Sequence, residues 1–219
     1  MDRRTMYTTS VERPAIEINK VLRNTYMLLA LTLGFSAITA VIAMMIGIGG
    51  GMSLVLTLAA FGTLFLLRSK ANSAAALPIT FLFTGLMGAS LGPILNYYVA
   101  AGSGALVFQA LAGTALIFFT LSAYVLITKK DFSFLGGFLF VGLMIAVIAV
   151  IANIFLGMAA LSLAINAVIL FIMSGFILFD TSRIIHGGET NYVMATVSLY
   201  LNIYNIFISL LSLLGASDD

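Results

Sequence analysis

Four long stretches of the chain contain no charged residue. They cover residues 24–67, 71–128, 132–179 and 190–217, which makes them 44, 58, 48 and 28 residues long. Because a membrane-spanning helix needs about 20 consecutive apolar residues, each of the first three stretches accommodates two such helices and the last accommodates one. The sequence therefore predicts an all-α, polytopic membrane protein with a bundle of seven transmembrane helices.

The composition excludes a water-soluble domain. Apolar residues make up 62% of the chain and charged residues 8%, whereas a soluble globular domain has about 25% charged residues. The chain has no cysteine, which excludes disulfides and cysteine-ligated metals. No cleavable signal peptide is expected, because the first apolar run follows a polar segment and leads into further membrane helices. The basic residues are scattered over short loops, so no nucleic-acid partner is expected.

Helix-breaking residues near the middle of the three long stretches mark the turns of the predicted hairpins. They are the glycine-rich run 47–51, the polar segment 96–104 and the pair Leu156-Gly157. A polar tail over residues 1–24 is expected to precede the helices, and a short tail over 215–219 to follow them. The predicted membrane helices cover residues 25–46, 52–67, 74–95, 105–127, 134–155, 158–179 and 193–214.

All ten lysine and arginine residues fall on one side of this arrangement. The loops on the opposite side have no charge, and the tail there has only Asp218 and Asp219. Because cytoplasmic loops of membrane proteins are enriched in basic residues, the N-terminus is predicted to be cytoplasmic and the C-terminus periplasmic. The basic residues are Arg3, Arg4, Arg13, Lys20, Arg23, Arg68, Lys70, Lys129, Lys130 and Arg183.

Small residues are predicted to hold the bundle together. Burying apolar surface against another helix gains little in lipid, so close packing through small residues must contribute instead. Gly85, Gly88 and Gly92 lie on the third predicted helix and include a Gly-xxx-Gly pair. Pro93 comes late in the same helix and should kink or end it. We interpret these four residues as a helix-packing motif.

Asp180 is the acidic residue nearest to the membrane interior. It follows the uncharged run 164–179 near the cytoplasmic boundary. Two interpretations stay open. Asp180 could be buried in the bundle, where a charged side chain costs about 2.5–3.5 kcal/mol, and could then act as a proton or ion gate. Alternatively it is hydrated and forms a weak local pair with Arg183, three residues later.

The seventh predicted helix has two amides three residues apart, Asn202 and Asn205. They are expected to point into the bundle, because amide donors facing lipid would stay unpaired. Their position makes them candidates for contact with the sixth helix and Asp180. Further amides at membrane depth are expected to form hydrogen bonds between helices; they are Asn96, Gln109, Asn153 and Asn166.

The only histidine, His186, lies in a glycine-rich loop beside Glu189. A lone histidine in a loop is usually hydrated, and a proton-sensing role would need Asp180 close by. The carboxylate and histidine clusters typical of metal sites are missing from the sequence, so neither a metal nor another cofactor is expected. The motifs of intramembrane metalloproteases, aspartyl proteases and serine hydrolases are missing as well. We therefore expect a protein that is not an enzyme.

Several motifs together resemble the Bax inhibitor-1 (TMBIM) family. The resemblance extends over nearly the whole chain from about Lys20, and the predicted helix count is the same. A proteobacterial branch that includes the modulator of the FtsH membrane protease is most similar, through residues 20–26, 133–137 and 184–192. The family motifs are matched by GLMGASLGPIL at 85–95, GTALIF at 113–118, FDT at 179–181, and LYLN at 199–202 with Asn205.

The resemblance implies a multi-pass protein of the bacterial inner membrane that binds an FtsH-type protease complex and restrains its degradation of membrane substrates. The polar tail is consistent with this function, because a protease that pulls on a membrane protein from the cytoplasm needs a flexible, extended segment to bind. Other members of the family resemble proton-sensitive calcium leak channels, in which two aspartates share hydrogen bonds. Here Asp180 matches the first aspartate and Asn202 the second, so an acid pair cannot form. Arg68 is a further candidate partner of Asp180, and calcium stays an alternative partner.

Overall fold

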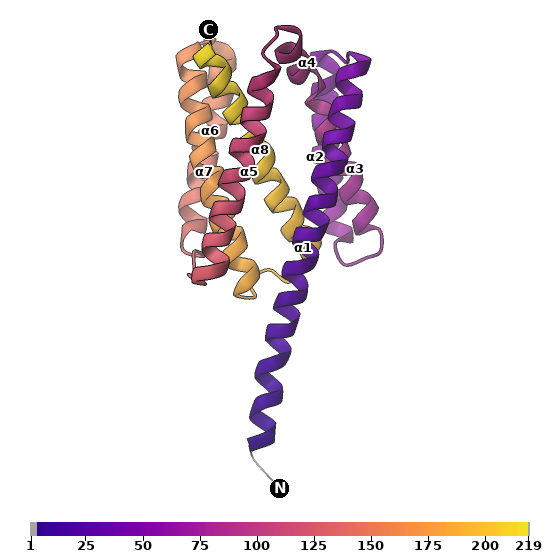
Figure 1. Ribbon diagram of the computed structural model, residues 1–219, viewed down its shortest axis with the longest axis vertical. Coiled ribbons are helices and arrows are strands. Elements are labelled where there is room, and N and C mark those ends of the chain that lie inside the picture. Colours follow the sequence, from indigo (N-terminus) through magenta and orange to yellow (C-terminus); the bar gives the residue numbers. More distant parts are fainter. Residues whose placement is uncertain (1–3, 219) are drawn as a thin grey trace.

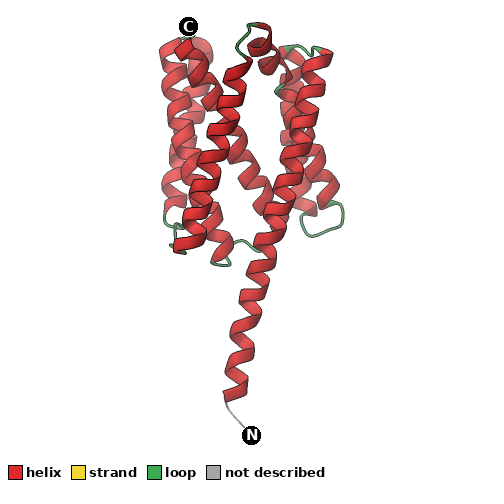
Figure 2. Ribbon diagram, viewed as in Figure 1, coloured by secondary structure: helices red, strands yellow, loops and turns green. Residues whose placement is uncertain are grey.

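The computed structural model describes residues 4–218, and all the regular secondary structure among them is helical (Figure 2). The helices pack side by side into an elongated bundle, with the N-terminus and the C-terminus at opposite ends (Figure 1). Their bounds are α1 Arg4–Ile46, α2 Gly50–Lys70, α3 Ala76–Ser90, α4 Gly92–Ala100, α5 Gly104–Thr128, α6 Leu135–Leu156, α7 Ala159–Ile185 and α8 Tyr192–Asp218.

Seven segments of the described chain are long and apolar enough to cross a membrane. Six of them are single helices or parts of single helices, and α3 and α4 together form the seventh. The predicted fold class, an all-α bundle of seven transmembrane helices, is therefore confirmed. The large apolar side chains of α6 are mostly exposed, as expected for a helix that faces lipid.

The structure differs from the sequence-based expectation at the N-terminus. The expected flexible tail continues α1 as a helix from Arg4, whereas the uncharged run of α1 that can cross the membrane begins only at Asn24. Extending an existing helix has no new nucleation cost and usually adds one backbone hydrogen bond per residue, although Pro14 has no N–H to donate to Ser10. As a result, α1 projects beyond the rest of the bundle (Figure 1).

The third membrane span is interrupted next to Pro93. Pro93 lies in the first turn of α4 and has no backbone N–H to donate to the preceding turn. Just before it, the N–H of Leu91 donates to the carbonyl oxygen three residues back, that of Gly88, at 3.0 Å. The regular helix α3 ends at Ser90. The span does not stop there, however, because α4 continues to Ala100. The expected loop at 96–104 is thus shortened to three residues.

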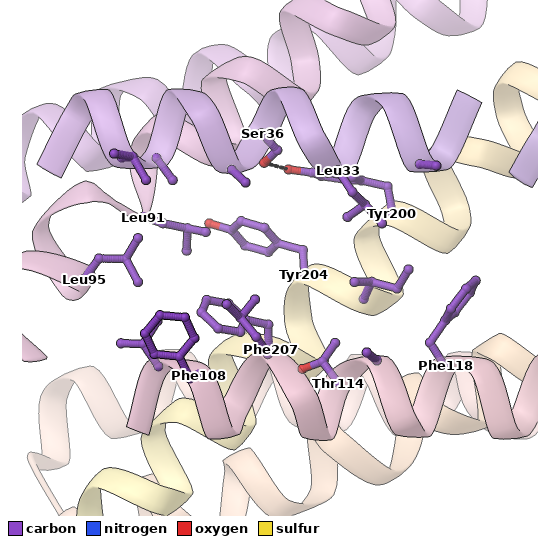
Figure 3. Close-up of a pocket in the computed structure, with 18 of the residues that line it drawn as sticks. Leu33, Ser36, Leu91, Leu95, Phe108, Thr114, Phe118, Tyr200, Tyr204 and Phe207 are labelled. Carbon is purple, nitrogen blue, oxygen red and sulfur yellow. Dashed lines mark hydrogen bonds between the residues drawn. The ribbon is translucent and has the colours of Figure 1, made fainter. Parts of the chain in front are cut away.

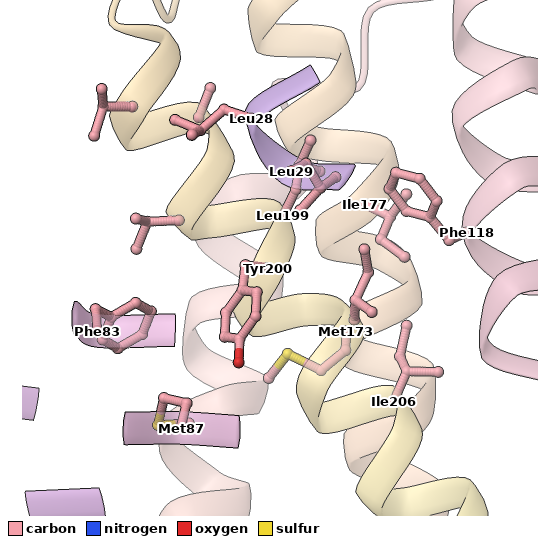
Figure 4. Close-up of a cluster of buried hydrophobic side chains, with 14 of the residues drawn as sticks. Leu28, Leu29, Phe83, Met87, Phe118, Met173, Ile177, Leu199, Tyr200 and Ile206 are labelled. Atoms are coloured by element: carbon pink, nitrogen blue, oxygen red, sulfur yellow. The ribbon is translucent and has the colours of Figure 1, made fainter. Parts of the chain in front are cut away.

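Helix α8 lies at the centre of the packing. It contacts α7 and α5 most extensively and also contacts α1 and α3. Figure 4 shows side chains of α8 among those of the surrounding helices in the main buried cluster. Leu199, Tyr200 and Ile206 of α8 are each at most 1% exposed, as are Phe83 of α3 and Ile177 of α7. The site residues on α7 and α8 are held by this core.

The glycines of the predicted packing motif face α1. A Cβ atom at Gly85 would lie 2.7 Å from the ring of Phe35, and one at Gly92 would lie 2.9 Å from the backbone of Ala43. At Gly88 an added Cβ would collide with the carbonyl oxygen of Ser36. Because these three glycines have no side chain, the backbone of α1 can approach α3 and α4 closely.

We predict that Gly88→Ala destabilises the protein by about 1–3 kcal/mol, because the new methyl group must push α1 away from α3. Gly62→Ala on α2 is the matched control, since no atom lies within 4 Å of a Cβ at that position. Thermal unfolding in detergent, followed by circular dichroism, measures the difference. Equal midpoints for the two variants would contradict the assignment of Gly88 to a tight helix contact.

Candidate functional site

The centre of the candidate site is a hydrogen bond between Asp180 of α7 and Asn202 of α8. The amide nitrogen of Asn202 donates to Oδ2 of Asp180 over 2.8 Å. The two residues are 9% and 5% exposed, so the pair is buried inside the bundle. Asp180 lies five residues before the end of α7, a rise of about 8 Å. Of the two interpretations of Asp180, the structure supports burial, close to the end of the bundle where the N-terminal extension lies.

The two candidate arginines do not form ion pairs with Asp180. Arg183 pairs instead with Glu189, at 3.6 Å, and its guanidinium lies over the ring of Phe179, 5.5 Å from the ring centre. Arg68 is an exposed residue in the last turn of α2. Among the side chains of residues 17–217, Asn202 is the only one that forms a hydrogen bond with Asp180. The hydrogen-bond partner of the acid is therefore a neutral amide.

The second amide of α8 does not join this pair. Asn205 donates to the carbonyl oxygen of Leu201, one turn back on the same helix, at 2.8 Å. Asn166 of α7 behaves as expected for an interhelical contact, because it donates to Ser212 of α8 at 3.0 Å. Asn153 donates to Ser162 at 2.8 Å and links α6 to α7. Asn96 and Gln109 are exposed.

A row of hydroxyl groups on α8 was not identified from the sequence. Thr196, Tyr200 and Tyr204 are spaced four residues apart and therefore share one helix face. That spacing is a signal that could have revealed the row. Each forms at least one hydrogen bond to another helix: Thr196 to the Thr25 carbonyl at 3.2 Å, Tyr200 to the Ser36 hydroxyl at 2.7 Å and the Thr84 carbonyl at 3.3 Å, and Tyr204 to the Ser90 hydroxyl at 3.0 Å.

A second polar cluster joins the end of α7 to the loop between α5 and α6. The ring of His186 contacts the carbonyl oxygen of Ser182 through Nδ1, at 2.8 Å, and that of Lys129 through Nε2, at 3.1 Å. The hydroxyl of Ser182 donates to Asp131 at 3.3 Å and accepts from the backbone N–H of Phe132 at 2.9 Å. His186 is exposed, as expected for a hydrated loop histidine, and its ring also contacts the loop between α5 and α6.

Hydrogen bonds lower the pKa of Asp131 below its usual value of 3.8. The largest cause is the backbone N–H of Ser133, which donates to Oδ1 of Asp131 over 2.8 Å, and the hydroxyl of Ser182 contributes further. Both donors stabilise the ionised carboxylate. The loop contact is therefore complete at neutral pH.

The described residues contain no group of three or more histidine, cysteine, aspartate or glutamate side chains that could hold a metal ion. Asp180 has an amide as its partner, and the cluster around His186 is made largely of hydroxyl and backbone groups. Neither arrangement resembles the sets of carboxylates and imidazoles that hold metals in proteins. The first joins two helices through a hydrogen bond, and the second joins the end of α7 to a loop.

Comparison with known proteins gives consistent matches over the whole chain. Residues 18–219 match the family model described as "Inhibitor of apoptosis-promoting Bax1". The chain is 54% identical, over the full length of both proteins, to the "Modulator of FtsH protease YccA" of Escherichia coli K12 and to the "Inner membrane protein YccA" of E. coli O6:H1. It is 55% identical to an "Uncharacterized membrane protein" of Vibrio cholerae, with 97% of this chain and 96% of that protein covered.

We predict that Asn202→Leu destabilises the folded protein by about 1–3 kcal/mol, because Asp180 is left buried without a hydrogen-bond donor. Asn205→Leu is the matched control on the same helix, and its smaller effect is expected because the Asn205 amide bonds only to its own backbone. Thermal unfolding in detergent gives both values. An equal loss in the two variants would show that the pair with Asp180 contributes nothing specific.

We also predict that the loop contact of Asp131 is present above pH 3.8 and is lost as the pH falls through the lowered folded-state pKa. A carboxylate whose pKa is depressed by folding stabilises only while it is ionised. Hydrogen exchange at the amide of Ser133, corrected for its intrinsic pH dependence, measures this contact. Asp131→Asn should remove the pH-dependent step, and a step that persists in this variant would assign the titration to another group.

Proposed function

Since this chain belongs to the Bax inhibitor-1 family, we propose that it is a non-catalytic regulator that binds an FtsH-type protease complex in the bacterial inner membrane. The observation on which the proposal rests is the 54% identity, over all of both chains, to the E. coli protein named as a modulator of that protease. Seven membrane-length helices and the inner-membrane name of the second E. coli relative agree with this localisation.

The proposed orientation has the N-terminal extension of α1 in the cytoplasm. The ends of α2 and α7 and the loop between α5 and α6 lie at the same end of the bundle as this extension (Figure 1). They contain Arg68, Lys70, Lys129, Lys130 and Arg183. Basic residues gather on the cytoplasmic side of membrane proteins. The helical segment from Arg4 to the start of the membrane span would then project toward the cytoplasmic part of a membrane protease. This supports the extension as a contact for the partner.

A second candidate function is a cation leak gated at Asp180. The observation in its favour is that Asp180 is buried near one end of the bundle and bonded to an amide of α8, the central helix. Breaking that one hydrogen bond would let α7 and α8 separate locally. Calcium is the ion that the family resemblance suggests. A leak and a regulatory role do not exclude each other.

Removing residues 1–16 should weaken the restraint on the protease by shortening the extension, and it leaves the uncharged membrane segment that begins at Asn24 complete. Decay of a membrane substrate of the protease should then accelerate in cells that contain normal amounts of the shortened protein. The matched control removes residues 216–219 at the other end and should not change the decay. If removing the whole protein also leaves the decay unchanged, the proposed function is wrong.

For the leak, Asp180→Asn keeps the size of the side chain and removes its charge. We expect calcium entry into dye-loaded vesicles to fall by about tenfold, which corresponds to ~1.4 kcal/mol in the barrier. The control is Asn205→Ala, three residues after Asn202 on α8. Asn205 does not bond to Asp180, so this variant should leave calcium entry unchanged. Equal entry through the parent protein and Asp180→Asn would eliminate this second candidate.

A further inference from the structure

A cavity of about 590 Å³ lies between α1, α4, α5 and α8. Figure 3 shows side chains of α1 and α5 on opposite sides of it, and Tyr204 and Phe207 of α8 between them. The floor is buried, since Leu29 is 2% and Tyr200 is 1% exposed. The rim is open, since Phe108 is 75% and Phe119 is 65% exposed. Because these rim residues belong to a membrane span, the cavity opens sideways into the bilayer.

The walls of the cavity are apolar. No charged residue lines it within the described chain, and the hydroxyl groups of Ser36, Thr114, Tyr200 and Tyr204 already have hydrogen-bond partners in the protein. The exception is the hydroxyl of Tyr26, which is buried and has no partner among the described residues. An ordered water needs two to four polar partners, and one free hydroxyl in an otherwise apolar cavity does not supply them. The walls therefore favour a hydrocarbon occupant.

The dimensions distinguish between two apolar occupants. On α1 the lining residues extend from Tyr26 to Met44, a rise of about 27 Å. A helix about 10 Å wide and of that length would fill roughly 2,000 Å³, far more than the 590 Å³ available. If a methylene group has about the volume of a water molecule, a chain of about 16 carbons needs ~480 Å³. The cavity fits an extended acyl chain and is too small for a partner helix.

One end of the cavity is closed by an aromatic contact between the same two helices. The rings of Tyr26 on α1 and Phe118 on α5 lie with their centres 5.9 Å apart. At the opposite end the wall is formed by Leu95 and Val99 of α4. An occupant is therefore limited in both directions along the helices and can enter only from the side.

We propose that this cavity binds one acyl chain of a phospholipid, which enters from the bilayer between α1 and α5. The bound chain supplies the packing atoms that α1 and α5 lack at this position. It thereby holds the helix whose N-terminal extension leaves the membrane. The inference rests on the volume, lining and opening of the cavity and is independent of the proposed function.

The chain contains no tryptophan, so a single tryptophan can report on the cavity. The reporter is Phe108→Trp at the rim, and its matched control is Phe138→Trp on α6, which replaces a residue that is 70% exposed. Phosphatidylcholine with brominated acyl chains, added to the full-length protein in detergent, quenches tryptophan fluorescence on contact. Saturable quenching is expected for Phe108→Trp, and weak, non-saturating quenching for the control. Identical curves for both proteins would overturn the proposal.

Filling the cavity provides a second test. Ala37→Phe, or Ala115→Phe on the opposite wall if the first variant does not fold, should reduce the saturable quenching at least several-fold. Ala59→Phe on the exposed face of α2 is the control and should leave it unchanged. Undiminished quenching in a folded cavity-filling variant would refute the lipid site. The fluorescence of Phe108→Trp could instead stay unchanged with brominated lipid and change on addition of an FtsH-type protease. That result would show that a protein occupies the cavity and would refute the lipid site.

Discussion

The bundle depends on close contacts between α8 and the helices around it. These contacts form in a bilayer, where the hydrophobic effect does not drive helices together. In lipid, apolar side chains are as well solvated by acyl chains as by other helices, so packing and hydrogen bonds must select one arrangement. The protein meets this requirement through α8, whose Thr196, Tyr200 and Tyr204 bond to helices α1 and α3. On a different face, Asn202 bonds to α7.

The contact between α1 and α3 solves the same problem in another way. Here no polar side chain is needed, because the three glycines of α3 and α4 let the backbone of α1 come close enough for extensive dispersion contacts. The bundle thus has one tightly packed side, around α1 and α3, and one side where α1 and α5 stand apart around the cavity. An acyl chain in that cavity would complete the packing with a component of the membrane itself.

The proposed leak depends on the buried pair of Asp180 and Asn202. A buried carboxylate with one neutral partner is a costly feature at a position where an apolar residue would pack more easily. Such a feature suggests a role in which α7 and α8 change their contact, as in the proposed leak. A regulator that acts through its N-terminal extension would use the same bundle mainly as an anchor. The two proposals therefore place function at different parts of one end of the molecule.

The number of membrane helices could be predicted from the sequence alone. Charged residues are costly inside hydrocarbon, so the lengths of the four uncharged stretches limit how many helices can cross the membrane. The position of Asp180 after an uncharged run and the spacing of the amides on the last helix made Asp180 and Asn202 candidates, and spacing also indicated Gly85, Gly88 and Gly92. The sequence did not reveal the continuous helix before Glu17, the continuation of α4 to Ala100 or the loop contact of His186.

Which polar side chains form hydrogen bonds with each other could be seen only in the folded structure. Arg68, Arg183 and Asn205 were all possible neighbours of Asp180 by position along the chain, and the structure joins the acid to Asn202 alone among the described side chains. The cavity beside α1 was equally hidden, since its walls combine α1, the consecutive helices α4 and α5, and the distant α8. The physical reason is that local sequence fixes which face of a helix is polar or small, whereas the packing of all the helices fixes which faces come into contact.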